Sequence, residues 1–325
     1  MELLPFRGRG LFQKENRIMK LTYTILITFL PIFLFSQQLP YGSNFRENQF
    51  VSNPAMTAAG NYMEINANYL QQWLGFNDAP RTARVHGQFP LENMGIGGLM
   101  QFDKTGPFQA SKFALTYAYK IPIGITSNDR LTIGVMGSIS EYQINQEEVI
   151  ATNQADIYLP VETSSTLTPN ASAGIYYTTN GEDDFDNNSF YIGLAANQLI
   201  SGNVPAFGEG IEANLKQKIH ANATAGVRII NDELALEPSV WVNYAQDNIN
   251  NFNMALRIEQ YDTFNAGLIY SSNQTLGLQL GMSIKNDFFK DGVLRVGILG
   301  NYNIGKVGAY QGLGYEFVVG YRFVK

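Results

Sequence analysis

From about Asn61 to Lys325, apolar and polar residues alternate along a long series of segments that short polar turns separate. The clearest segment is the last one, Gln311 to Phe323. Its odd positions are Leu313, Tyr315, Phe317, Val319, Tyr321 and Phe323. Because successive strand side chains point to opposite faces, this pattern predicts a strand between an apolar and a polar medium. A soluble sandwich uses the same alternation, but its repetition over long strands and an export signal upstream favour a membrane.

The composition excludes several classes of protein. Only 15% of the 325 residues are charged, yet no run of about 18 uncharged apolar residues follows the N-terminal region, which excludes a helical membrane protein. Cysteine is absent, which excludes disulfides, thiolate metal sites, cysteine nucleophiles and a lipidated N-terminal cysteine. The net charge of −6 gives no reason to expect nucleic acid as a partner.

The N-terminal region predicts export. Residues 19–36 carry one lysine and then an apolar core, which is typical of a signal peptide with a cut after Ser36. A membrane anchor is the alternative reading, but the run is short and Pro31 interrupts it. Residues 1–18 do not fit the start of a signal and indicate a leader or a start codon assigned too early. We expect residues 37–60 to form an N-terminal periplasmic segment.

Residues 61–325 contain about fourteen segments long enough to cross a membrane as tilted strands, which takes roughly 9–11 residues. They are near 61–72, 80–90, 95–103, 111–122, 130–143, 170–178, 189–198, 216–230, 233–245, 250–260, 263–271, 274–285, 292–304 and 311–324. The fold class is therefore all-β, a transmembrane up-and-down antiparallel β-barrel of about 14 strands in the bacterial outer membrane, in contact with its lipid. Closure removes the strand edges that lipid would not tolerate.

Loop lengths agree with this topology. If both barrel ends are periplasmic, the odd-numbered hairpins face outward, where loops are longer. The two longest connections, 144–169 and 199–215, both fall on that side. Several inward turns are tight, and residues 181–188 are a longer inward exception.

The same alternation places charged side chains in the barrel interior, opposite the apolar face of each strand. These lumen charges are Arg84, Arg228, Glu237, Arg257, Glu259, Arg295, Glu316 and Arg322, with His86 beside them. Charges at membrane depth are costly unless they pair or face water. Their mixed signs predict a hydrogen-bonded, partly filled lumen, and a structural role is favoured over transport.

No arrangement of residues predicts catalysis, a metal or a cofactor. Only two histidines exist, His86 and His220, and no spacing marks a serine as the partner of either. The acidic stretch 182–186 lacks the ordered spacing of a calcium loop and is typical of a solvated turn. The glycines of 95–98 start a strand with no helix after them, which disfavours a phosphate loop.

Several short motifs stand out in the first hairpins. Asn53-Pro54-Ala55 and Gly60 precede the first strand. The first outward hairpin holds Trp73, Gly75, Phe76 and Pro80, and the second holds Asp103, Gly106 and Pro107. With LTIGVMG (131–137), GIYY (174–177) and EFVVGYRF (316–323), in this order and spacing, the chain resembles the PorP/SprF family of outer-membrane proteins of Bacteroidetes type IX secretion and gliding systems, over about residues 44–325.

This resemblance implies that the barrel assists export or surface attachment of a secreted, adhesin-like protein, with a link to gliding motility. Other type IX secretion components are the further partners it implies. The chain departs from the family pattern at Ile304 and Tyr315, which favours a partner dedicated to one secreted protein. The alternative is a passive channel or hydrophobic-solute transporter. The first-hairpin residues, exposed aromatics among them, are the candidate partner-binding motif, although a turn or a lipid-interface belt would also explain them.

Overall fold

The computed structural model describes residues 42, 44–123, 129–149, 164–180, 187–200, 217–245, 249–261, 263–285 and 292–323. The expected leader and signal peptide lie outside these residues, as does most of the connection expected at 144–169. The strands are β1 (Met63–Gln71), β2 (Arg81–Pro90), β3 (Met94–Thr105), β4 (Phe108–Pro122), β5 (Arg130–Ile144), β6 (Ser164–Thr178), β7 (Ser189–Asn197), β8 (His220–Asn231), β9 (Leu234–Ala245), β10 (Ile249–Gln260), β11 (Phe264–Ser271), β12 (Thr275–Ile284), β13 (Gly292–Asn303) and β14 (Leu313–Phe323).

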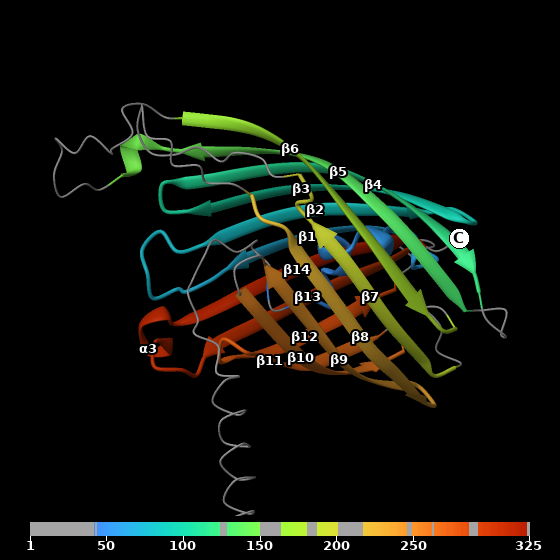
Figure 1. The fold of residues 1–325 in the computed structure, drawn as a ribbon. Helices are drawn as coiled ribbons and strands as arrows, with labels where there is room; N and C mark the ends of the chain where they lie inside the picture. The colour runs from blue at the N-terminus through green and yellow to red at the C-terminus, as the bar shows by residue number, and fades with distance from the viewer. Residues whose placement is uncertain are drawn as a thin grey trace, which may run out of the picture.

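Each strand pairs with its sequence neighbour, and β14 pairs with β1 to close the barrel (Figure 1). In the closing ladder Met63 lies opposite Phe323 and Gln71 opposite Tyr315, both in antiparallel register. Fourteen antiparallel strands in a closed up-and-down barrel confirm the expected fold class. No helix among the described residues is long and apolar enough to cross a membrane.

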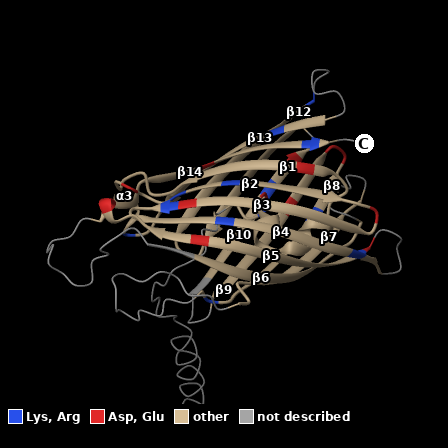
Figure 2. Ribbon diagram, turned by 90° about the horizontal axis from the view of Figure 1, so that it is seen from above, with Lys and Arg blue, Asp and Glu red and all other residues tan. Residues whose placement is uncertain are grey.

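The strand alternation sorts side chains between the two faces of the wall. On β4, Phe113, Leu115, Tyr117 and Tyr119 are exposed on the outer face, whereas the residues between them are buried in the barrel. Figure 2 shows how few charged residues lie along the strands. The outer face is therefore an apolar band of the kind that lipid requires.

The sixth strand begins earlier than its sequence indicated. It was expected at 170–178, but β6 starts at Ser164, six residues sooner, and pairs with β5 along its whole length. The added stretch is mostly serine and threonine without apolar alternation, so the periodicity rule could not find it. The eighth strand begins later than expected, at His220 instead of 216.

The two ends of the barrel differ. At the end where β1 begins and β14 ends, connections such as 91–93 and 232–233 are short. The longest connections, 145–163 and 198–219, join strands whose ends lie at the opposite end of the barrel. We call these the short-turn end and the long-loop end; in outer-membrane barrels the short turns face the periplasm. Two short helices lie at the long-loop end, η2 (Gln146–Glu148) and α3 (Gly308–Gln311).

The closing strand generates the first prediction. Phe323 is the last residue of β14, lies opposite Met63, and packs edge-on against Tyr321 at 4.7 Å between ring centroids. Phe323→Asp should lower the amount of inserted barrel. A charge at the membrane edge costs only about 0–1 kcal/mol directly, but the substitution also removes an aromatic contact at the closure. The measurement is the heat-modifiable, membrane-embedded fraction on a gel. Phe323→Tyr is the control that should insert normally, and normal insertion of the aspartate variant would contradict the prediction.

Candidate functional site

Residues 44–60, which the sequence suggested would be a periplasmic segment, lie inside the barrel. This plug contains α2 (Gln49–Ser52) and η1 (Pro54–Ala58), and all residues of both helices are buried. Figure 1 shows these blue turns within the outline of the barrel, and η1 contacts β2 to β6. The plug folds inward because its apolar residues cluster with the inner faces of those strands.

The plug's apolar contacts fill the interior. Phe50, Val51 and Met56 belong to one buried cluster with residues of the wall. The wall contributes Leu99, Ala114, Met136, Tyr176 and Tyr191. Phe50 also stacks on His86 at 5.1 Å between ring centroids. Burying side chains of this size is worth about 1.5–3 kcal/mol each, so the cluster stabilises the plug in place.

The Asn53-Pro54-Ala55 motif forms the turn between the two helices of the plug. The Asn53 side chain accepts a hydrogen bond from the Ala55 amide at 3.0 Å and donates one to the Ile175 carbonyl on β6 at 3.1 Å. Pro54 occupies the first turn of η1, where its missing amide hydrogen costs nothing. One amide side chain therefore caps η1 and ties it to the barrel wall.

Glycines on the inner face of the wall make room for this turn. A Cβ added at Gly134 would overlap the Pro54 backbone, and one at Gly174 would overlap the Asn53 side chain. At Gly95 it would lie 2.6 Å from the Thr57 carbonyl oxygen. We call Gly95, Gly134 and Gly174, with Gly97 and Gly193, the glycine trough. Sequence reasoning missed it, although small residues recurring in the lumen phase of adjacent strands were a usable signal.

The glycine trough gives the second prediction. Gly134→Val should lower the thermal midpoint, because the plug must shift to admit the side chain and such overpacking typically costs about 1–3 kcal/mol. Gly137→Val on the same strand is the matched control, since a Cβ there meets nothing within 4 Å. Thermal unfolding of purified protein in detergent measures both. Equal midpoints for the two variants would mean that the plug does not depend on the trough.

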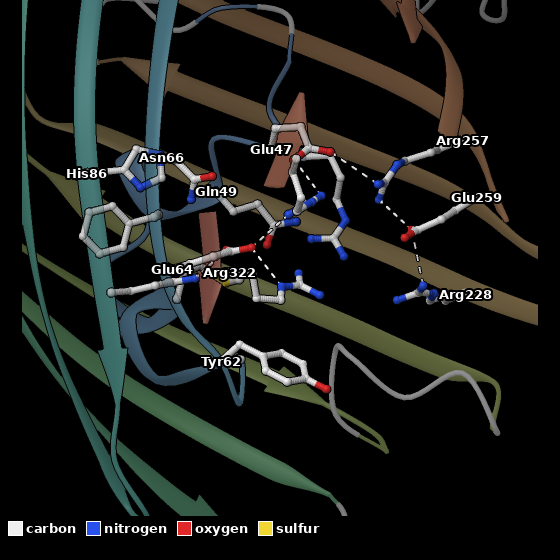
Figure 3. Close-up of a pocket in the computed structure, with 16 residues that line it drawn as sticks. Glu47, Gln49, Tyr62, Glu64, Asn66, His86, Arg228, Arg257, Glu259 and Arg322 are labelled. Atoms are coloured by element: carbon white, nitrogen blue, oxygen red, sulfur yellow. Dashed lines mark hydrogen bonds and ion pairs between the residues drawn. The ribbon is translucent and has the colours of Figure 1, made fainter. Parts of the chain in front are cut away.

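Six of the eight predicted lumen charges form one connected network with Arg46, Glu47 and Glu64 at the short-turn half of the barrel (Figure 3). Each glutamate bridges two arginines. Glu259 lies 3.3 Å from Arg228 and 3.2 Å from Arg257; Glu47 of the plug lies 3.4 Å from Arg257 and 3.2 Å from Arg295. The bridging continues through Glu64 and Glu237. Glu64 lies 3.0 Å from Arg295 and 3.1 Å from Arg322. Glu237 lies 2.5 Å from Arg46 and 3.9 Å from Arg257.

Two other predicted lumen charges lie farther toward the long-loop end. Arg84 is buried and its Nε donates to Gln101 at 2.9 Å. Glu316 is fully buried and accepts hydrogen bonds of 2.7 Å from the amides of Asn48 and Asn68. The structure thus places all eight predicted lumen charges on the inner face, and plug residues contact four of them: Glu237, Arg257, Arg295 and Glu316.

Glu47 is the plug's main electrostatic link to the wall. Burial alone would raise the pKa of its carboxyl, but Arg295, Arg257 and Arg46 outweigh burial and lower the pKa to about 2. Because the pKa of this carboxyl is lower in the folded protein, the carboxylate stabilises the fold at pH values above its ordinary pKa of 4.5. That contribution is lost as the pH falls toward the folded value.

Glu47→Gln gives the third prediction. The neutral amide leaves Arg257 and Arg295 short of a carboxylate, and breaking a buried pair this way costs up to roughly 3–5 kcal/mol. The loss of stability should be constant above about pH 5 and shrink between about pH 4.5 and pH 2. Thermal unfolding across pH measures this. Glu148→Gln, at the exposed pair with Lys104, is the control that should change little.

The predicted hairpin motifs meet at the long-loop end. The Leu74 and Gly75 amides donate to the Leu313 and Gln311 carbonyls, both at 2.9 Å, and Gly106 donates to Asp78 at 3.1 Å. A Cβ on Gly75 would overlap the Tyr310 carbonyl, and Gly106 has φ +54°. We call these connected hairpins, 72–80, 106–107 and 304–312, the rim. Backbone packing therefore explains the motif's glycines.

The other motif residues divide between the rim's structure and its surface. The Pro80 carbonyl accepts from the Gln72 amide and the Pro107 carbonyl from the Asn145 amide, both at 2.9 Å. Asp103 faces the lumen and accepts a hydrogen bond from Thr82. Trp73 and Phe76 remain exposed, at 41% and 49% of their surface. Among the described residues no group of three or more histidine, aspartate or glutamate side chains could hold a metal ion.

Comparison with solved structures places this architecture among outer-membrane barrels. The Pseudomonas putida toluene transporter TodX matches with a TM-score of 0.52 and 9% identity, over 88% of this chain and 98% of TodX. The CymD monoaromatic hydrocarbon channel matches with a TM-score of 0.51 and 12% identity, over 90% of this chain and 95% of CymD. At these identities the likeness shows the fold alone. No functionally curated protein matches the sequence.

A family model gives the more specific result. The model described as "Type IX secretion system membrane protein PorP/SprF" matches residues 34–321. That range includes the plug, its Asn53-Pro54-Ala55 turn, and all but the last residues of β14. The protein is thus an outer-membrane β-barrel, and it belongs to the PorP/SprF family of type IX secretion system membrane proteins.

Proposed function

We propose that this barrel assists export or surface attachment of one secreted, adhesin-like protein, with a link to gliding motility, and that it does so at the ends of the barrel and not through its lumen. The family match supports a role in type IX secretion and association with other secretion components. The plug is the observation that supports a role at the ends of the barrel and not through its lumen. Its apolar cluster, its glycine trough and its ion pairs together fill the short-turn half of the lumen.

The filled lumen makes a polypeptide conduit an unfavourable role. The cavity between the plug and the charged residues of the wall has a volume of about 100 Å³, which holds only a handful of water molecules at about 10–15 Å³ each. Passage of a chain would require the plug to leave and the network of Glu47 to break. A barrel of this kind is better suited to present a surface to a partner.

The rim supplies a surface suited to a secreted partner. Trp73 and Phe76 are exposed beside Tyr310 of α3, which is 73% exposed. Trp73 has φ +52°, a conformation that costs a bulky residue about 1–2 kcal/mol. Strain of this kind tends to occur at functional sites, and exposed aromatics anchor interfaces. These residues support a docking role for the rim, whereas an aromatic belt at the lipid interface would account for the exposure alone.

One observation favours the alternative of a passive channel or hydrophobic-solute transporter. The β6–β7 ladder covers only Ala173–Thr178, which leaves a gap in the ladder toward the long-loop end. The described contacts there are hydrogen bonds from the Leu199 amide to the Ala171 carbonyl and from the Ile200 amide to the Asn170 side chain. TodX and CymD are named as a toluene transporter and a hydrocarbon channel. However, the side chains beside this gap are polar: Asn170 hydrogen-bonds Gln217, which donates to Tyr142 at 2.6 Å. That lining disfavours an apolar solute.

Deletion of the gene gives the fourth prediction. Surface proteomes of the wild-type and deletion strains should differ by the loss of one large surface protein while general type IX export continues. A broad export defect would instead indicate a core component. An unchanged surface proteome with altered solute uptake would overturn the secretion proposal in favour of the channel.

A rim variant refines this experiment. Trp73→Ser with Phe76→Ser, expressed in the deletion strain, should insert normally but fail to restore the surface protein. Leu91→Ser is the matched control, because Leu91 is also an exposed apolar residue but lies in a turn at the short-turn end. Full restoration by the rim variant would remove the rim from the proposal.

A further inference from the structure

The cavity between the plug and the charged residues of the wall is a chamber of about 100 Å³ in the short-turn half of the barrel (Figure 3). One water molecule needs about 10–15 Å³ of such space, so the chamber has room for a small organic group. Gly60 and Tyr62 line it where the plug leads into β1, and both are half-buried. Because β1 begins at the short-turn end, the chamber lies next to the periplasmic mouth of the barrel.

Charge does not select what this chamber holds. Each of the five arginines on its described lining forms an ion pair with a glutamate. The pairs are Arg46 with Glu237, Arg228 and Arg257 with Glu259, and Arg295 and Arg322 with Glu64. A charged ligand would compete with pairs that already exist, and it would lose its own hydration on entry. The ligand that suits this lining is therefore neutral and polar.

Gln49 of α2 presents an amide group without a partner to the chamber. The residue is 4% exposed, yet neither its amide nitrogen nor its amide oxygen makes a hydrogen bond in the described structure. The Nδ1 atom of His86, which also lines the chamber and is 4% exposed, makes none either. Buried polar groups are nearly always hydrogen-bonded, so a donor and an acceptor left open on one side chain indicate a molecule that offers both.

The lining also has an apolar side. Phe50 and Met56 of the plug line the same chamber as Gln49. Phe50 is held in place by its stack on His86 at 5.1 Å between ring centroids. Water gains nothing from an apolar wall, whereas an organic group with polar and apolar atoms gains from both parts of the lining. The chamber therefore favours such a group over water alone.

We propose that the chamber binds one residue of an extended polypeptide that reaches in from the short-turn end, and that the Gln49 amide pairs with the backbone of that residue. In an extended strand the N–H and C=O of one residue point to the same side, so a single amide side chain can accept from one and donate to the other. The N-acetyl group of a sugar cannot pair in this way, because its N–H and C=O are trans to each other. The two-point match therefore favours a peptide over a glycan. The inference does not depend on the function proposed above, which concerns the rim.

The test uses the purified full-length protein in neutral detergent and ligand-observed NMR. The probe is N-acetylglycine N-methylamide, which holds one residue between two peptide groups. We expect saturable binding below about 10 mM, a range open to a ligand of so few atoms, and a rise in the thermal midpoint. N-methylacetamide, whose single peptide group can form only one of the two bonds at a time, should bind roughly tenfold more weakly.

Three outcomes of this test would contradict the proposal. Absence of saturable probe binding would mean that water fills the chamber, and would overturn the proposal. Equal binding of N-methylacetamide and the probe would overturn the two-point pairing. Tighter binding of N-acetylglucosamine than of the probe would assign the chamber to a glycan instead.

Variants of Gln49 locate the binding. Gln49→Met keeps a similar volume but removes the amide, so it should insert, should not lower the thermal midpoint of the free protein, and should bind the probe at least roughly tenfold more weakly. Gln101→Met is the matched control: Gln101 is also a buried lumen glutamine, but it accepts from Arg84 at 2.9 Å outside the chamber, so probe binding should be unchanged. Gln49→Asn withdraws the amide by one methylene and should also weaken binding, which keeps the test decisive if the methionine variant does not insert. Unchanged probe binding by either inserted Gln49 variant would overturn the assignment.

Discussion

Every feature of this molecule depends on the pairing of β1 with β14. Within a lipid bilayer, an unpaired backbone amide or carbonyl has no water to bond, so a sheet can span the membrane only when it has no free edge. The ladder from Met63↔Phe323 to Gln71↔Tyr315 provides that closure. Closure also creates an interior with fixed walls, and both the plug and the charge network use this interior.

The interior is organised by two different interactions that act at the same place. Shape positions the η1 turn, since the glycine trough admits a backbone where any side chain would collide. Charge fixes the segment before it, where Glu47 and Arg46 join the wall's arginines and glutamates. Shape complementarity is insensitive to salt and pH, whereas the ion pairs weaken when carboxylates are protonated. The plug is therefore retained by one interaction when the other is reduced.

The sequence was sufficient to predict the barrel and its lumen charges but not the plug. Alternation along a strand such as β4 carries the necessary information, because lipid and lumen impose opposite polarity on neighbouring residues. The same alternation puts Arg257 and Glu316 in the inner-face phase, but it does not indicate which partners they meet. Residues 44–60 have no period to read, and their fit depends on glycines 40 to 140 positions away, as Asn53 and Gly174 illustrate. The sequence motif includes Gly75, but the need for a glycine there comes from the Tyr310 carbonyl of another hairpin, which a side chain would overlap.

The separation in sequence between the plug and its partners has a kinetic consequence. Asn53 bonds Ile175 across 122 positions, and Arg46 meets Glu237 across 191. Contacts this distant form only after the intervening strands have paired, so they belong to the late part of assembly. Interactions absent from the transition state leave the folding rate nearly unchanged and slow unfolding instead. The plug thus acts as a lock that closes after the barrel is built and that sets how long the finished barrel persists.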